Sequence, residues 1–130
     1  VGNAAANVLS GQGGADYLSG MAGNDVLIGG AGTDTLLGGQ GTDYFYGGAS
    51  GADYFLMEAA AVLNGERDYL MDFSAAEGDF TMLPVAYQAS TYFNSYGTYA
   101  FAYVWTGSGA YSIFAANTSV ADLQSHTYFF

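Results

Sequence analysis

A nine-residue repeat is the feature of this sequence that most restricts how the chain can fold. Six consecutive units span residues 2–56, and the sixth unit carries one additional residue. Every unit opens with glycine, has Asp or Asn at the sixth or equivalent position, and places an apolar residue two positions later. The acidic or amide residues are Asn7, Asp16, Asp25, Asp34, Asp43 and Asp53. A short fixed period predicts a solenoid, in which successive units stack on one another.

Each unit predicts one tight turn followed by one short strand. Glycine at the first, second and fourth positions, as in Gly29, Gly30 and Gly32, permits the positive φ that tight turns need. The last three residues of each unit form a short strand with its apolar residue pointing inward. Two units would then make one 18-residue coil with a strand on each side. Stacked coils would give two parallel sheets around a thin aliphatic core.

Two other interpretations of the glycines explain the sequence less well. A flexible glycine-rich linker predicts no fixed phase between Gly, Asp and Leu, whereas here these residues recur in phase. A phosphate-binding glycine loop requires a lysine, and the chain has none. The repeat is therefore interpreted as a structural unit.

Charge and composition restrict the partners. The chain has 12 carboxylates, one Arg and no Lys, for a formal net charge of −11. Nucleic acid and anionic lipid are excluded as expected partners, because both are bound through Lys and Arg. Cysteine is absent, so neither disulfides nor thiolate metal sites can form. No apolar run is long enough for a membrane span, and no cleavable signal peptide is visible. Cations are the natural partners of such a chain.

Two units carry a resemblance to a known family. Residues 29–37 read GGAGTDTLL and residues 38–46 read GGQGTDYFY. Both match the nonapeptide G-G-x-G-x-D-x-U-x of the calcium-binding repeats-in-toxin (RTX) proteins. The resemblance implies an all-β fold, a right-handed parallel β-roll with calcium in its turns. It also implies export by a type I secretion system and an extracellular location, secreted or on the cell surface.

The segment after the repeats looks like the C-terminal domain of secreted serralysin-type metalloproteases. Its marks are Asp68, Asp72 and Phe73, followed by Gly78 and Asp79. The zinc signature His-Glu-x-x-His of those proteases is absent, so the protease activity does not carry over. The first repeat also departs from the family pattern, with Asn in place of Asp, and is expected to form an edge coil with a weak or missing site.

Calcium takes six to eight oxygen ligands, which carboxylates and exposed turn carbonyls supply. Magnesium is disfavoured by its demand for a tighter octahedron, and zinc by the lack of nearby Cys or His. Turns on one side of the roll lie two units apart, so we expect the pairs Asp16 with Asp34, Asp25 with Asp43, Asp34 with Asp53, and Asp43 with Asp68. The predicted metal ligands are Asn7, Asp16, Asp25, Asp34, Asp43, Asp53, Asp68, Asp72, Gly11, Gly13, Gly20, Gly29, Gly30, Gly32, Gly38, Gly39, Gly41 and Gly47. Glu58, Glu66 and Glu77 are expected to be solvated.

The chain is divided here into a roll over residues 1–56, a roll-closing segment over 57–83 and an aromatic β cap over 84–130. Residues 81–130 are interpreted as strands, and residues 99–105 and 110–116 are predicted to form a hairpin around a turn at 106–109. This hairpin would cap the open end of the roll. Asp122 and His126 are the only Asp, Glu, His, Lys or Arg residues in the cap. An aromatic surface with so little charge implies a partner.

No catalytic site is expected. His126 is the only histidine, Asp122 precedes it by four residues, and no G-x-S-x-G sequence occurs. Three functions remain open: a self-assembling extracellular subunit of a filament, surface layer or matrix; the secretion and folding module of a larger enzyme or adhesin; and a module that binds glycans or another surface. Calcium ions are the expected cofactor, with self-association or another extracellular surface as the further partner.

Overall fold

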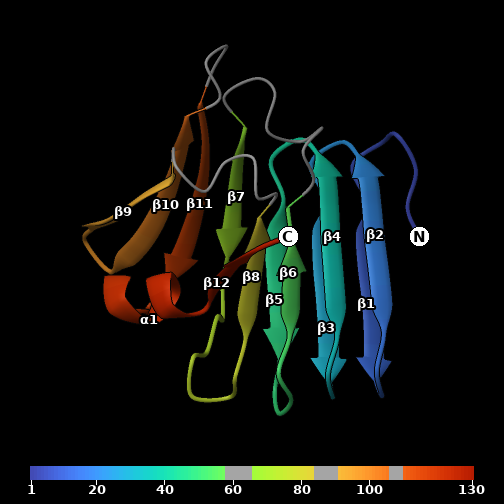
Figure 1. Ribbon diagram of the computed structural model, residues 1–130. Coiled ribbons are helices and arrows are strands. Elements are labelled where there is room, and N and C mark those ends of the chain that lie inside the picture. Colours follow the sequence, from blue (N-terminus) through green and yellow to red (C-terminus); the bar gives the residue numbers. More distant parts are fainter. Residues whose placement is uncertain (58–65, 84–90, 106–109) are drawn as a thin grey trace.

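The chain folds into two facing β-sheets built from stacked coils (Figure 1). The computed structural model describes residues 1–57, 66–83, 91–105 and 110–130. The strands of the repeats are β1 (Val8–Gly13), β2 (Tyr17–Ala22), β3 (Val26–Ala31), β4 (Thr35–Gln40), β5 (Tyr44–Gly48) and β6 (Tyr54–Leu56). Consecutive strands alternate between the two sheets, so that each pair of units makes one coil, as predicted.

The roll continues beyond the repeats. In one sheet, β7 (Arg67–Leu70) pairs in parallel with β5, and in the other β8 (Phe80–Leu83) pairs in parallel with β6. The strand orders are β1-β3-β5-β7-β11-β10-β9 and β12-β8-β6-β4-β2. The register aligns equivalent repeat positions, for example Leu27 with Phe45. Together these pairings confirm the predicted all-β parallel β-roll.

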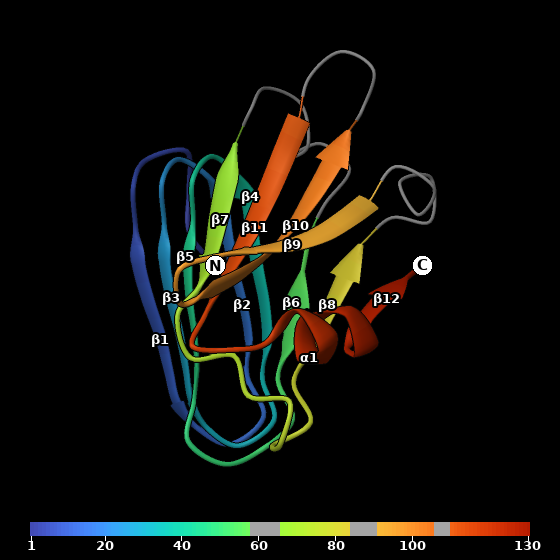
Figure 2. The ribbon, with the colours of Figure 1, turned by 90° about the vertical axis from the view of Figure 1, so that its left-hand side faces the viewer.

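One apolar residue per unit fills the space between the sheets, as predicted. Figure 2 shows the two layers of strands from the side. Leu27, Leu36, Phe45 and Phe55 are fully buried, and the rings of Phe45 and Phe55 meet edge to face with centroids 6.0 Å apart. Burying such a side chain stabilises the fold by about 1.5–3 kcal/mol. The core of the repeats is therefore thin, with one inward apolar side chain from each strand of the two sheets.

The predicted hairpin is present and extends one sheet. Strands β10 (Tyr99–Trp105) and β11 (Ala110–Ala116) are antiparallel, and β9 (Thr91–Tyr96) adds to the far side of β10. Ala100 and Ala102 face the core while Tyr103 faces out, which matches the predicted alternation. The predicted turn at 106–109 lies outside the described residues. Because β11 pairs in parallel with β7, the hairpin covers the last edge of the rolled part of this sheet.

A short helix interrupts the part of the chain that was interpreted as strands only. Helix α1 (Val120–Ser125) precedes β12 (Thr127–Phe129), which pairs with β8. The Ser119 side chain accepts a hydrogen bond from the Asp122 N–H at 3.0 Å and so caps the helix, and Leu123 is fully buried. A capping serine followed by apolar residues three positions apart favours a helix. The strand prediction is therefore wrong for Val120–Ser125.

Candidate metal centre in the turns

The sixth-position residues line the two edges of the roll in two rows. The first acidic row consists of Asn7, Asp25, Asp43 and Asp68, and the second acidic row of Asp16, Asp34, Asp53 and Asp79. Within each row, the backbone N–H of one residue donates to the Oδ1 atom of the next at 2.7–3.0 Å. All four predicted pairs are therefore brought together. Two contacts, Asn7 with Asp25 and Asp53 with Asp79, extend the rows beyond the predicted pairs.

These carboxylates are buried in a chain that has few positively charged side chains. Asp25, Asp34 and Asp43 are 0% exposed, although the chain has only one Arg and no Lys. One carboxylate oxygen, Oδ2, is buried without a hydrogen-bond partner in four residues: Asp16, Asp25, Asp34 and Asp43. Removing a charge from water without a partner costs several kcal/mol, on the order of the stability of a small domain. The repeats therefore present buried carboxylate oxygen atoms that have no hydrogen-bond partner, where a cation would be stabilising.

The first glycine of each unit leaves room beside these oxygens. A Cβ atom placed on Gly11 would come within 2.5 Å of Asp16 Oδ2 and 2.7 Å of the Gly29 carbonyl oxygen. One placed on Gly20 would collide with Asp25 Oδ2 and lie 2.6 Å from the Gly38 carbonyl oxygen. Carboxylate and carbonyl oxygens of neighbouring coils therefore face the same small space. Both are ligands that calcium prefers.

The donor set fits calcium better than a soft metal. In the part of the chain that the structure describes, no group of three or more His, Cys, Asp or Glu side chains is placed to hold a metal ion. A site in these turns must therefore draw on backbone carbonyls in addition to one or two carboxylates. Calcium accepts such a mixture, whereas structural zinc sites use four Cys or His ligands.

Burial raises the pKa values of four carboxylates in the acidic rows, those of Asp43, Asp53, Asp68 and Asp79. The pKa of Asp43 and that of Asp53 rise from 3.8 to about 6, mainly because both carboxylates are removed from water. Repulsion from the carboxylate of Asp25 raises the pKa of Asp43 further, and that of Asp79 raises the pKa of Asp53. Burial also raises the pKa of Asp72. Burial and mutual repulsion thus disfavour the ionised form of these carboxylates, which is the form that binds a cation.

The predicted ligands beyond the repeats have different surroundings. Asp72 accepts the backbone N–H groups of Gly47 and Gly48 at 2.7 and 3.0 Å, one on each carboxylate oxygen. Its carboxylate lies against the start of a turn rather than in either acidic row. Its assignment as a calcium ligand remains a prediction.

The glycines differ among themselves. Gly30, Gly32, Gly39 and Gly41 have φ between 101° and 128°, which L-residues with side chains rarely adopt. Gly13 does not: its φ is not positive, and a Cβ there would lie 3.6 Å from the nearest atom outside its neighbours, Ala31 O. The turn geometry falls instead on Gly14 and Gly23, at φ of 109° and 108°. Gly14 is the fourth residue of the unit that opens with Gly11, so the nine-residue period already indicated a turn glycine at this position.

Glu66 differs from its predicted solvated state. Its side chain is partly buried, its carboxylate accepts a hydrogen bond from the Gly41 backbone, and its Oε2 atom is buried without a hydrogen-bond partner. Glu66 stands two residues before Asp68, where the repeats have glycine two residues before aspartate. Glu77 is exposed, as predicted, and Glu58 lies outside the described residues.

Comparison with known proteins identifies the repeats. The family described as RTX calcium-binding nonapeptide repeat (4 copies) matches residues 1–36 and 19–54. A search of the curated proteins found no match. Among the described residues, no helix is long and apolar enough to cross a membrane. Residues 1–54 of the chain are thus RTX calcium-binding nonapeptide repeats.

Proposed function

We propose that this RTX protein is extracellular and folds when calcium bridges its coils. The observation that carries the proposal is the set of four buried Oδ2 atoms without hydrogen-bond partners, in a chain with no lysine. A divalent cation bound between the turns would neutralise these oxygens and join successive coils. Its ligands would be the carboxylates of Asp16, Asp25, Asp34 and Asp43, together with turn carbonyls such as that of Gly29.

Calcium concentration would then decide where the protein folds. The ligands of one site lie about two units apart in the unfolded chain, so the free energy of metal binding becomes free energy of folding. Extracellular calcium modules bind calcium at about 10⁻⁴–10⁻³ M, far above the cytosolic level. The chain would stay unfolded inside the cell and fold after export. Secretion by a type I system is part of this proposal and rests on the resemblance to exported RTX proteins.

Circular dichroism tests calcium-dependent folding. We expect the β signal and the melting temperature to fall in excess chelator, and to return with millimolar calcium but not with equal magnesium. Unchanged spectra and melting in chelator would contradict the proposal.

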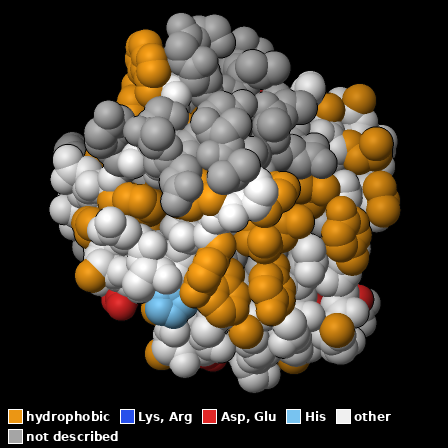
Figure 3. Space-filling model, viewed as in Figure 1, with side chains coloured by type: hydrophobic (Ala, Val, Ile, Leu, Met, Phe, Trp, Pro, Cys, Tyr) orange, Lys and Arg blue, Asp and Glu red, His pale blue; other side chains and the backbone are white. Residues whose placement is uncertain are grey.

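We further propose that the calcium-loaded protein assembles with copies of itself into an extracellular structure. Aromatic side chains line the outer faces of both sheets: Tyr44, Tyr69 and Phe114 stack with centroids 5.0 and 5.3 Å apart, and Tyr54 stacks on Phe80 at 5.5 Å. Figure 3 shows hydrophobic side chains gathered on the face that carries β6, β8 and β12. Aromatic surfaces of this kind are typical of protein interfaces.

Charge and strand edges favour a second copy as the partner. Four calcium ions, one at each aspartate whose buried Oδ2 atom lacks a hydrogen-bond partner, would add eight positive charges to a formal net charge of −11 and so reduce repulsion between copies. Among the described strands, β1 and β2 end the two sheets on one side of the molecule, and β9 and β12 on the other. Head-to-tail docking of these edges does not form a closed ring, so repeated docking would produce a fibre.

Light scattering and electron microscopy of this chain test assembly. We expect multimers in millimolar calcium that dissociate in chelator. A persistent monomer at high protein concentration would overturn the assembly proposal and favour the alternative of a secretion and folding module of a larger protein.

A surface-binding role is the second candidate. A hollow of about 510 Å³ is lined by Tyr54, Phe80, Met82, Tyr128 and Phe129. Rings with polar tips around a shallow hollow suit a glycan or another extracellular surface. Retention of the monomer on a glycan array, abolished by Tyr128→Ala but not by Tyr103→Ala, would favour this role over assembly.

We propose no catalytic role for the chain. His126 Nδ1 lies 2.9 Å from Ser125 Oγ and 3.0 Å from the backbone oxygen of Asp122. The Asp122 carboxylate instead accepts the Ser119 hydroxyl at 2.6 Å. The His126 ring stacks on Phe80 at 5.8 Å, so its surroundings suit packing rather than proton transfer to a nucleophile.

A further inference from the structure

The first acidic row ends in a contact that the repeats lack. Within the repeats, Asp25 and Asp43 each use Oδ1 to accept a backbone N–H and leave Oδ2 without a partner. Asp68, the last member of the row, also uses Oδ1 to accept the Asp43 N–H, at 2.9 Å. Its Oδ2 atom, however, accepts the hydroxyl of Tyr111. The oxygen that has no hydrogen-bond partner in Asp25 and Asp43 therefore has one in Asp68.

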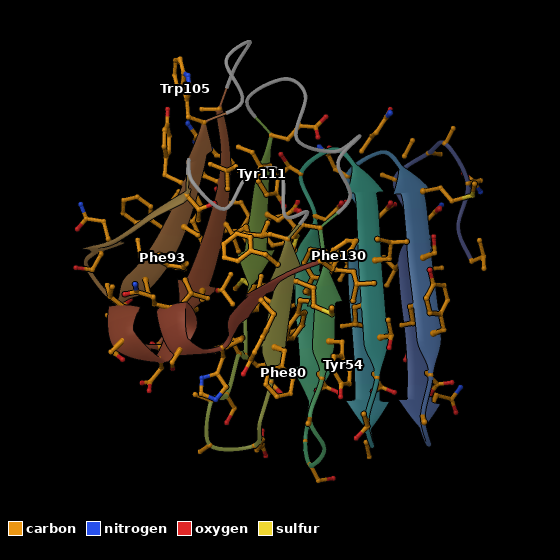
Figure 4. The ribbon with its side chains drawn as sticks, in the orientation of Figure 1. Tyr54, Phe80, Phe93, Trp105, Tyr111 and Phe130 are labelled. Atoms are coloured by element: carbon orange, nitrogen blue, oxygen red, sulfur yellow. The ribbon has the colours of Figure 1, made fainter. Side chains whose placement is uncertain are left out.

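Tyr111 is firmly held in this position. It lies on β11 beside β7, and its ring is fully buried (Figure 4). The Sδ atom of Met57 lies 2.8 Å from the same hydroxyl. Asp68 is 2% exposed, so water has little access to this contact. A hydrogen bond from a buried neutral donor to a carboxylate is one of the stronger kinds of hydrogen bond in proteins.

The second acidic row ends in an equivalent way with a different donor. Asp79 accepts the Asp53 N–H on Oδ1 at 3.0 Å and the Ser74 N–H on Oδ2 at 2.8 Å. In each row, two aspartates have a buried Oδ2 atom without a hydrogen-bond partner, whereas the last carboxylate accepts a hydrogen bond on both oxygens. The same arrangement thus occurs at the ends of both rows with different donors, the Tyr111 hydroxyl and the Ser74 N–H.

We propose that Tyr111 terminates the first acidic row in the place of a calcium ion, so that Asp68 is a structural acceptor and not a calcium ligand. The phenol supplies one O–H donor to the oxygen that a further cation would otherwise neutralise, and its ring fills the space beside it. The bond also ties the C-terminal hairpin to the roll without metal. This inference rests on the proposed calcium binding, and it limits the number of calcium ions the roll takes.

Calcium stoichiometry separates a terminator from a ligand. Isothermal titration of the full chain compares wild type with Asp43→Asn and Asp68→Asn, both of which keep an oxygen for the backbone N–H that each carboxylate accepts. We expect Asp43→Asn to bind at least one calcium ion fewer, and Asp68→Asn to bind the wild-type number. Loss of a calcium ion in Asp68→Asn would overturn the proposal.

Thermal unfolding in saturating calcium tests the phenol itself. Tyr111→Phe keeps the ring but leaves Asp68 Oδ2 buried and without a donor, so we expect the melting temperature to fall by about 5 °C or more. Tyr103→Phe, on the exposed face of β10, is the matched control and should melt as wild type does. Equal melting of Tyr111→Phe and wild type would show that calcium already satisfies Asp68, and would overturn the proposal.

The two proposals fail in different ways. A wild-type chain that binds no calcium would refute calcium-dependent folding, and the melting of Tyr111→Phe would then still decide whether the phenol holds Asp68. Normal calcium binding by wild type together with a lost ion in Asp68→Asn would refute the terminator alone.

Discussion

At the scale of single residues, the role of an aspartate depends on whether it lies in an acidic row or elsewhere in the chain. Asp34 donates its N–H to Asp53, accepts the Asp16 N–H at 2.8 Å, and keeps a buried Oδ2 atom without a hydrogen-bond partner. It therefore takes part in two neighbouring turns of the second acidic row. Asp122, by contrast, is exposed and contacts the helix cap. The same type of side chain thus links two turns in one place and caps a helix in the other.

Asp34→Asn should weaken calcium binding more than Asp122→Asn. The amide keeps the acceptor for the Asp16 N–H but loses the charge that attracts the cation, so we expect about tenfold weaker binding, or about 1.4 kcal/mol. Isothermal titration measures the difference. Superimposable curves for the two variants would argue against the site assignment.

Gly29 and Gly13 differ in how much space is available for a side chain. A Cβ on Gly29 would collide with Asp34 Oδ2 and lie 2.6 Å from the Gly47 carbonyl oxygen, whereas one on Gly13 has room. We expect Gly29→Ala to destabilise the calcium-loaded roll by about 2–3 kcal/mol through overpacking. Gly13→Ala is the control and should change stability by about 0.5 kcal/mol or less. Denaturant titration in calcium measures both variants. Equal midpoints would contradict the close approach of Asp34 Oδ2 and the Gly47 carbonyl oxygen to Gly29.

At the scale of elements, the C-terminal half closes the roll with two devices. Strand β11 extends one sheet, and α1 packs its Leu123 side chain into the core that the sheets share. Helix α1 is too short to be stable alone, because isolated helices below about 12 residues are marginal in water. Its contacts with the core must therefore hold it in place.

Leu123→Ala should destabilise the folded protein substantially. The side chain is 0% exposed, and deletion of a buried leucine costs about 2–5 kcal/mol. Val8→Ala, at a side chain that is 73% exposed on β1, is the control and should have little effect. Thermal melting in calcium compares the two variants. If both melt alike, α1 does not anchor the end of the roll.

At the scale of the whole molecule, a chain with net charge −11 buries much of its charge in two rows. Without metal, these carboxylates repel one another and lack water. With calcium, the same groups would join the coils. The balance between these states depends on protons as well as on calcium, because a proton also removes the charge.

Acid should stabilise the calcium-free fold and weaken calcium binding. The pKa values of Asp43 and Asp53 are about 6 in the folded state against an ordinary 3.8, so the folded state binds more protons between these values. The stability of the calcium-free fold is therefore greatest below about pH 4 and falls as the pH rises through about 6. In chelator, the β signal should increase from pH 7 to pH 5, while the calcium affinity should decrease over the same range. Calcium-free stability that instead rises with pH would contradict the buried rows.

The sequence by itself determined the repeating part of this protein. The turns, the strand register, the inward apolar residues and the pairing of Asp16 with Asp34 all follow from a period of nine, because each coil repeats contacts with the coil two units away. These contacts join residues far apart in sequence, but one repeat rule predicts all of them. The family pattern added calcium to the same positions.

Only the tertiary structure decided how the roll ends. Tyr111 meets Asp68 across 43 positions of sequence, and no period relates the two residues. The partial burial of Glu66 and the pairing of β11 with β7 likewise depend on where the C-terminal half folds back. Composition had indicated only that this half is aromatic and nearly uncharged. Contacts that occur once have no repeated signal in the sequence, so their partners become visible only when the chain is folded.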